Sequence, residues 1–301
     1  YTYLWSSNIV NDSVPNPITS PNTTTTYNVV VIADPGFANG STCTDTAFIT
    51  VTVLQLPTLS LSQFAEACEN DSPFILSGGS PTPGGYSGNG VIGGTSFNPS
   101  LANIGTNTIT YSYTDNNSCS NTITEPLVVN PLPSVSFSNS NLDIICIDEG
   151  IVTLSGGLPS LGTYSGTGVI NNTFDPSIAN IGSHTIWYTY TDPNNGCSDS
   201  ASHTITVTAL PIVSFLITNP TQVCSNENPF QLSGGIPSSG NGVYSGVGVT
   251  GGTTFNPSLS SIGNNTITYT YADANGCSNT ATQNIDVLEA PQPSTVIGTL
   301  G

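Results

Sequence analysis

Seven cysteines are the residues of this chain whose spacing most clearly indicates chemistry. Six of them form two series that repeat every 78 to 80 residues: a first series of Cys68, Cys146 and Cys224, and a second series of Cys119, Cys197 and Cys277. None has the C-x-x-C spacing typical of zinc sites, so the series are interpreted as disulfide partners in an oxidising compartment. The shared register predicts one disulfide inside each repeat, joining Cys68 to Cys119, Cys146 to Cys197 and Cys224 to Cys277. Cys43 is expected to be unpaired within the chain.

All formally charged side chains are acidic, because the chain has 18 aspartates and glutamates and no lysine or arginine. The formal net charge of −18 leaves no basic patch for nucleic acid and no basic cluster for an anionic membrane surface. It also removes lysine and arginine as catalytic groups. No apolar stretch reaches the length of about 18 residues that a transmembrane helix needs. We therefore expect neither nucleic-acid binding nor membrane insertion.

Few other residues have the spacing of a catalytic or metal site. His184 and His203 fall on adjacent strands of one predicted hairpin, but no acidic or cysteine cluster and no nucleophile elbow accompanies them. Two G-x-G-x-x-G segments, beginning at Gly88 and Gly246, lack the helix that dinucleotide binding requires and are interpreted as turn glycines. We expect no enzyme activity, no cofactor and no metal.

The turns carry recurring acids, Asp115, Asp192 and Asp273, each beside asparagine. Calcium needs six to eight oxygen ligands, so turn hydrogen bonding is the preferred interpretation and calcium the alternative. Trp187 replaces a threonine of the other repeats on the polar face of a predicted strand. An outward tryptophan can contact a sugar or a partner protein, and an incidental exposed aromatic is the alternative.

Landmarks recur in the same order in each repeat. In the first repeat they are Leu-Ser-Gly-Gly from Leu76, Tyr-Ser-Gly-x-Gly-Val from Tyr86 and a Thr-Ile-x-Tyr-x-Tyr segment from Thr108. The last segment alternates apolar and small polar residues, which predicts a strand with one buried face. A turn over residues 115–118 and a return strand over about 120–129 follow. Asn98-Pro99 and its equivalents predict a single helical turn with an asparagine or aspartate N-cap.

About seven short strands per repeat predict an all-β fold of tandem immunoglobulin-like β-sandwiches arranged in a rod. The expected domains are a partial sandwich over residues 1–57 that lacks its first strands, repeat 1 over 58–133, repeat 2 over 134–211 and repeat 3 over 212–289. Residues 290–301 are expected to be the first strand of a following or neighbouring domain. Linkers are nearly absent, since Pro57, Pro133 and Pro211 join one repeat directly to the next.

These landmarks resemble the PKD-like and immunoglobulin-like tandem repeats of large Bacteroidota cell-surface proteins, including gliding-motility-type adhesins. Residues 1–53 look like the form with Tyr-x-Trp-Ser and Gly-x-Cys-Thr, and residues 58–288 like the form with Tyr-Ser-Gly-x-Gly-Val. The resemblance implies type IX export, an extracellular or cell-surface location and a role in adhesion or filaments. It also implies O-glycosylation of Asp-Ser/Thr-apolar triplets, which here contain Ser13, Thr46 and Ser200.

We predict from these features a non-catalytic structural segment of a secreted filament or adhesin stalk. The alternative is an adhesin module that binds carbohydrate or protein around Trp187. The expected partners are like subunits or adjoining repeats, head to tail, with surface glycans as further candidates. Two assembly routes stay open: the chain continues in both directions, or residues 290–301 complete the first domain of a neighbouring subunit by strand addition.

Overall fold

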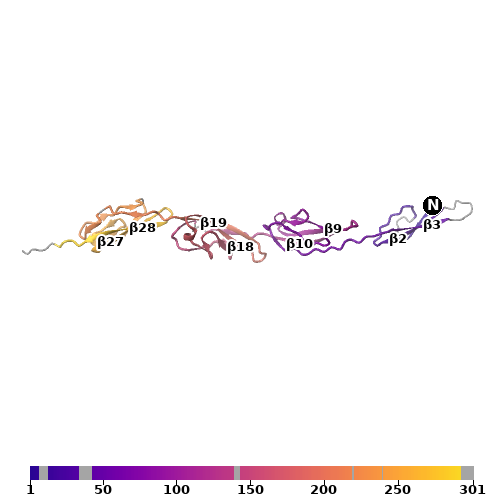
Figure 1. The fold of residues 1–301 in the computed structure, drawn as a ribbon, viewed down its shortest axis with the longest axis horizontal. Helices are drawn as coiled ribbons and strands as arrows, with labels where there is room; N and C mark the ends of the chain where they lie inside the picture. Colours follow the sequence, from indigo (N-terminus) through magenta and orange to yellow (C-terminus); the bar gives the residue numbers. More distant parts are fainter. Residues whose placement is uncertain (7–12, 34–42, 139–142, 219, 239, 293–301) are drawn as a thin grey trace, which may run out of the picture. The chain divides into compact units, whose positions relative to one another are not determined.

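The computed structural model describes residues 1–6, 13–33, 43–138, 143–218, 220–238 and 240–292 (Figure 1). The chain divides into two compact units, Tyr1–Leu132 and Pro133–Gly301. The first unit contains the N-terminal segment (residues 1–57) and nearly all of repeat 1, and the second contains repeats 2 and 3. Nearly all of the regular structure is β, as the sequence predicts.

The N-terminal segment forms one antiparallel sheet in the order β1-β2-β3. Its strands are β1 (Thr2–Trp5), β2 (Thr25–Ile32) and β3 (Thr44–Val51). Tyr27 and Val29 of β2 are buried. The indole Nε1 of Trp5 donates to the carbonyl of Val14 at 2.9 Å, which ties the chain before β2 to the sheet. Strand β3 is exposed along almost its whole length, and Phe48 on it is 73% exposed.

Repeat 1 has two sheets. The larger, in the order β4-β10-β9-β6, contains β4 (Ala67–Cys68), β10 (Ser120–Asn130), β9 (Gly105–Thr114) and β6 (Gly85–Ser87). The smaller, in the order β5-β8-β7, contains β5 (Phe74–Ile75), β8 (Ser96–Phe97) and β7 (Val91–Ile92). A 3-10 turn, η1 (Pro99–Leu101), connects β8 to β9.

Repeats 2 and 3 have the same two sheets and each adds a two-stranded one. Repeat 2 contains the sheets β12-β19-β18-β15, β13-β17-β16 and β11-β14. Its strands are β11 (Ser136–Phe137), β12 (Ile144–Cys146), β13 (Val152–Thr153), β14 (Gly157–Leu158), β15 (Thr163–Ser165), β16 (Val169–Ile170), β17 (Thr173–Phe174), β18 (Gly182–Thr191) and β19 (Ser198–Thr208). A helical turn, α1 (Pro176–Ala179), connects β17 to β18.

Repeat 3 contains the sheets β21-β28-β27-β24, β22-β26-β25 and β20-β23. Its strands are β20 (Ser214–Phe215), β21 (Gln222–Cys224), β22 (Phe230–Gln231), β23 (Gly235–Ile236), β24 (Gly242–Ser245), β25 (Val249–Thr250), β26 (Thr254–Phe255), β27 (Gly263–Ala272) and β28 (Ser278–Leu288). The 3-10 turn η2 (Pro257–Leu259) occupies the place of η1 and α1.

The two sheets of each repeat enclose one core, as their alternating sequences predict. In repeat 1, Ile109 of β9 is 0% exposed and Tyr111 is 1% exposed. Phe97 comes from the smaller sheet and is also fully buried, in the same cluster as Ile109 and Leu127. The predicted helical turn is confirmed too, because the side chain of Asn98 accepts a hydrogen bond from the Ser100 amide at 3.1 Å.

A pair of tyrosines explains why the Leu-Ser-Gly-Gly and Tyr-Ser-Gly segments recur together. In repeat 3 the rings of Tyr244 and Tyr269 lie 4.8 Å apart, and the hydroxyl of Tyr244 accepts a hydrogen bond from the Gly235 amide at 3.0 Å. A Cβ atom on Gly235 would lie 2.6 Å from the Tyr269 ring. The glycine is therefore needed where the backbone approaches the ring. Repeats 1 and 2 build the same contact with Tyr86 and Tyr164.

The predicted disulfide pairing is wrong. The structure bonds Cys146 to Cys277, and Cys119 and Cys224 are free thiols. Hence Cys68 does not bond to Cys119, Cys146 does not bond to Cys197, and Cys224 does not bond to Cys277.

The long strands explain the error. Cys146 pairs in register with Thr208, at the end of β19, whereas Cys197 directly precedes the start of this strand at Ser198. Ten residues of strand span about 33 Å, but a disulfide needs Cα atoms within about 7 Å. The two cysteines of one repeat are therefore at opposite ends of its large sheet. Cys224 and Cys68 lie at the corresponding ends of their large sheets, where Cys224 pairs with Leu288 and Cys68 pairs with Asn130.

Candidate functional site: the disulfide-linked joint between repeats 2 and 3

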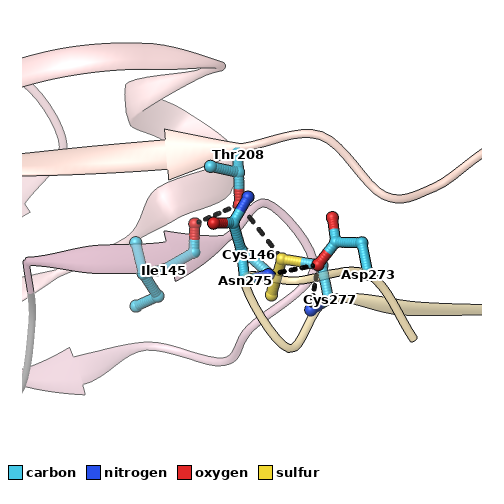
Figure 2. The surroundings of a disulfide bond; sticks show 6 residues. All are labelled: Ile145, Cys146, Thr208, Asp273, Asn275 and Cys277. Carbon is cyan, nitrogen blue, oxygen red and sulfur yellow. Dashed lines mark hydrogen bonds between the residues drawn. A yellow bond between two sulfur atoms is a disulfide. The ribbon is translucent and has the colours of Figure 1, made fainter. Parts of the chain in front are cut away.

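The disulfide joins the end of one sheet to the hairpin of the next repeat. Cys146 is the last residue of β12, and Cys277 closes the hairpin between β27 and β28. Their Cα atoms lie 5.6 Å apart (Figure 2). Thr208 Oγ1 lies 3.0 Å from Sγ of Cys277 and 3.3 Å from the carbonyl of Ile145. Since a disulfide sulfur has no proton, the hydroxyl is the donor, and its single proton is shared between the sulfur and the carbonyl.

The hairpin that presents Cys277 is ordered by its own aspartate. Asp273 Oδ1 accepts hydrogen bonds from the amides of Asn275 at 2.9 Å and Cys277 at 3.0 Å (Figure 2). Asp115 makes the equivalent bond to the Cys119 amide at 2.9 Å, and Asp192 accepts from the Asn194 amide at 2.9 Å. These acids therefore make the turn hydrogen bonds that the preferred interpretation predicts.

A second contact lies at the same joint. The side-chain amide of Asn279 donates to the carbonyl of Pro211, in the linker before repeat 3, at 3.0 Å. Asn121 makes the equivalent bond to the carbonyl of Pro57, before repeat 1, at 2.9 Å. These asparagines were missed as joint residues, although they occupy the same position two residues after the second-series cysteine. That recurrence was the available signal.

A hollow of about 310 Å³ lies beside the disulfide. Repeat 2 lines it with residues of β12 and the following loop, including Cys146 and Glu149, and repeat 3 lines it with Asn275 and Gly276 of the hairpin. The hollow therefore marks the same contact between the end of one large sheet and the hairpin of the next repeat.

The other cysteines fall into two states. Cys68 and Cys197 are also disulfide-bonded. Cys43, as expected, is a free and exposed thiol, while Cys119 and Cys224 are free and partly exposed. Three thiols therefore remain for chemistry outside the bonds present in the structure.

The two histidines have separate structural roles. His184 Nε2 lies 2.9 Å from the carbonyl of Asn180, so this nitrogen is the donor. Asn107 of repeat 1 occupies the equivalent position and donates to the carbonyl of Asn103 at 2.7 Å. His203 Nε2 lies 2.9 Å from the carboxylate of Asp143. Within the described residues no three histidine, cysteine or acidic side chains cluster as metal ligands.

Of the predicted surface residues, Trp187, Thr46 and Ser200 lie on strands and Ser13 lies in a turn. Trp187 of β18 is 46% exposed and has Ser165 and Ser202 directly opposite on the neighbouring strands. Ser13, Thr46 and Ser200 are exposed. Asp12, which begins the first glycosylation triplet, lies outside the described residues. No helix among the described residues has the length and apolar character of a membrane span.

No family model matches the chain, and no curated protein matches its sequence. Among solved structures, the one titled "Ca2+-stabilized adhesin helps an Antarctic bacterium reach out and bind ice" aligns over 96% of this chain and 90% of that chain, at 15% identity and a TM-score of 0.36. The human desmocollin-1 ectodomain covers 97% of this chain and 73% of that one, at 13% identity and a TM-score of 0.24. Drosophila N-cadherin EC1-4 covers 96% and 92%, at 13% identity and a TM-score of 0.23. At these TM-scores the likeness does not extend to function.

Proposed function

We propose that this chain is a non-catalytic structural segment of an extracellular filament or adhesin stalk. The observation that carries the proposal is the disulfide between Cys146 and Cys277, which bonds the sheet of one repeat to the hairpin of the next. A bond in this place cross-links two repeats that have separate cores. It therefore stabilises the connection between repeats 2 and 3 more than it stabilises the fold of either repeat. Persisting disulfides favour an oxidising, extracellular compartment.

The proposed segments keep the boundaries expected from the sequence: a first domain over residues 1–57 and repeats over 58–133, 134–211 and 212–289. The strand expected over 290–301 falls mainly on residues 293–301, which lie outside the described residues. Like subunits are proposed to follow one another head to tail. The resemblance to Bacteroidota surface repeats adds type IX export to the proposal. Neither a catalytic group nor a cofactor enters the proposed role.

The disulfide gives repeats 2 and 3 a mechanical property that supports a stalk. Cys146 and Cys277 are 131 residues apart in sequence. When the ends of the chain are pulled, force passes through the sulfur–sulfur bond, so the enclosed chain cannot extend to its full length. Each residue of extended chain spans about 3.3–3.6 Å, so roughly 430–470 Å is the upper limit of the length that the bond withholds. Cys197 lies inside the enclosed segment and is itself disulfide-bonded, so the bond between Cys146 and Cys277 accounts for only part of that length.

Single-molecule pulling on the full chain tests the proposal. We expect oxidised wild-type protein to release less length than oxidised Cys146→Ser/Cys277→Ser protein, by an amount below the upper limit of roughly 430–470 Å because the bond at Cys197 remains in both. The matched control is Cys119→Ser/Cys224→Ser, which replaces two free thiols and should behave as wild type. Equal release by wild type and the Cys146→Ser/Cys277→Ser variant would show that the bond bears no load.

A second candidate function is ligand binding at Trp187, because this indole is 46% exposed between two serines on an open sheet face. The flat aromatic ring and flanking hydroxyls suit the apolar face and hydroxyl groups of a sugar. Titration of surface glycans against wild type and Trp187→Thr tests it, since threonine occupies this position in the other repeats. Equal binding by the two proteins would remove Trp187 from the candidate site.

O-glycosylation of Ser13, Thr46 and Ser200 is proposed from the same resemblance. Each of the three hydroxyls is on an exposed residue. Intact-mass measurement of the native protein is the test, and a mass of 30.9 kDa for this segment would count against any glycan.

A further inference from the structure

The disulfide at the joint follows a positional rule. Cys146 is the last residue of β12, which pairs in parallel with the end of the long strand β19. Its partner, Cys277, directly precedes β28 of the following repeat. The rule therefore joins the first-series cysteine of one repeat to the second-series cysteine of the next.

Cys224 occupies the position of Cys146 at the corresponding end of repeat 3. It is the last residue of β21 and pairs in register with Leu288, at the end of β28. The backbone then turns identically: the Glu227 amide donates to the Cys224 carbonyl at 3.0 Å, and the Glu149 amide donates to the Cys146 carbonyl at 3.1 Å. Unlike Cys146, Cys224 is a partly exposed free thiol.

Cys43 occupies the position of Cys277. It directly precedes β3, the last strand of the N-terminal sheet, as Cys277 precedes β28. Two residues later, Asp45 Oδ1 accepts a hydrogen bond from the Thr46 amide at 2.8 Å, and Asn279 Oδ1 accepts from the Thr280 amide at the same distance. Cys43 is an exposed free thiol.

We propose that Cys224 of one copy forms a disulfide with Cys43 of a second copy. The inference rests on the proposed head-to-tail association and adds the covalent bond that holds it. The interface is head to tail and does not close, so each added copy exposes a new Cys224 and the product is a linear polymer.

The chemistry is thiol–disulfide exchange with a low-molecular-weight disulfide as the oxidant. One thiolate attacks the oxidant, forms a mixed disulfide and releases one reduced thiol. The second thiolate attacks the protein sulfur of this mixed disulfide and releases the other reduced thiol. The two cysteines lose two protons and two electrons, and the oxidant becomes two thiols.

Oxidation of the purified full chain with oxidised glutathione tests the proposal. Non-reducing electrophoresis should show a ladder at multiples of 30.9 kDa for wild type and for the matched control Cys119→Ser. Cys43→Ser alone and Cys224→Ser alone should stay monomeric. A mixture of these two variants should stop at the dimer, because only one Cys224 and one Cys43 remain to react. Near-ultraviolet circular dichroism checks that each variant is folded.

Three results would overturn the proposal: a ladder from either single variant, loss of the ladder in Cys119→Ser, or a wild-type protein that stays monomeric. Peptide mapping of the dimer must also find Cys43 linked to Cys224. If the chain stays monomeric while the pulling experiment still shows the withheld length, this inference fails and the proposed structural function stands.

Discussion

Replacing Tyr244 by phenylalanine is expected to destabilise repeat 3 alone. The side chain is 9% exposed, and its hydroxyl accepts the hydrogen bond of the buried Gly235 amide at 3.0 Å. Phenylalanine keeps the ring contacts with Phe215 and Tyr269 but leaves that amide without its partner. An unsatisfied buried donor costs about 1–3 kcal/mol. For a domain of this size, each kcal/mol lowers the Tm by roughly 4–8 °C.

Hydrogen exchange of the full chain in increasing urea is the appropriate assay, because a chain of several domains does not unfold in one transition. Peptides from repeats 1 and 2 serve as internal references. Tyr271→Phe is the matched control, since within the described residues the Tyr271 hydroxyl makes no hydrogen bond. A change below about 0.5 kcal/mol in repeat 3, or an equal loss in all three repeats, would refute the reasoning.

Three further predictions concern single residues within the repeats. His184→Asn should keep the stability of repeat 2 and His184→Ala should lower it by about 1 kcal/mol in urea unfolding, because only asparagine retains a donor. Burial raises the pKa values of Tyr111 and Tyr269, so the folded state holds the phenol protons more tightly than the unfolded state does. The resulting contribution to the free energy of unfolding should be fully present below about pH 10 and should be lost as the pH rises through the folded pKa values, which pH titration of unfolding measures. Gly90→Ala should destabilise repeat 1 more than Gly93→Ala in hydrogen exchange: both have positive φ, but a Cβ on Gly90 would meet the Phe97 ring at 2.7 Å, and nothing lies within 4 Å of one on Gly93.

The elements with a local signal could be predicted from the sequence. Alternation around Ile109 and Tyr111 predicts the buried face of β9, and Asn98-Pro99 predicts the capped turn that follows β8. The role of His184 was also accessible, because aligning the repeats places it on Asn107. In each case the signal is local: either an apolar residue recurs at every second position, or the hydrogen bond joins residues that are close in sequence.

The disulfide pairing had no such local signal. It depends on β12 pairing in parallel with the far end of β19, a contact between segments more than 60 residues apart, and β12 has only three residues. A strand this short shows no period that would reveal its neighbour. The contact between Asn279 and Pro211 spans a comparable separation and was missed for the same reason.

Non-reducing peptide mapping of the native protein tests the central claim most directly. The chain has no lysine or arginine, so digestion requires a protease other than trypsin, such as one that cleaves after glutamate or aromatic residues. We predict a linked pair of peptides that contain Cys146 and Cys277, which disappears on reduction. Links from Cys146 to Cys197 and from Cys224 to Cys277 would instead place each disulfide inside one repeat and contradict the account of a covalently joined series.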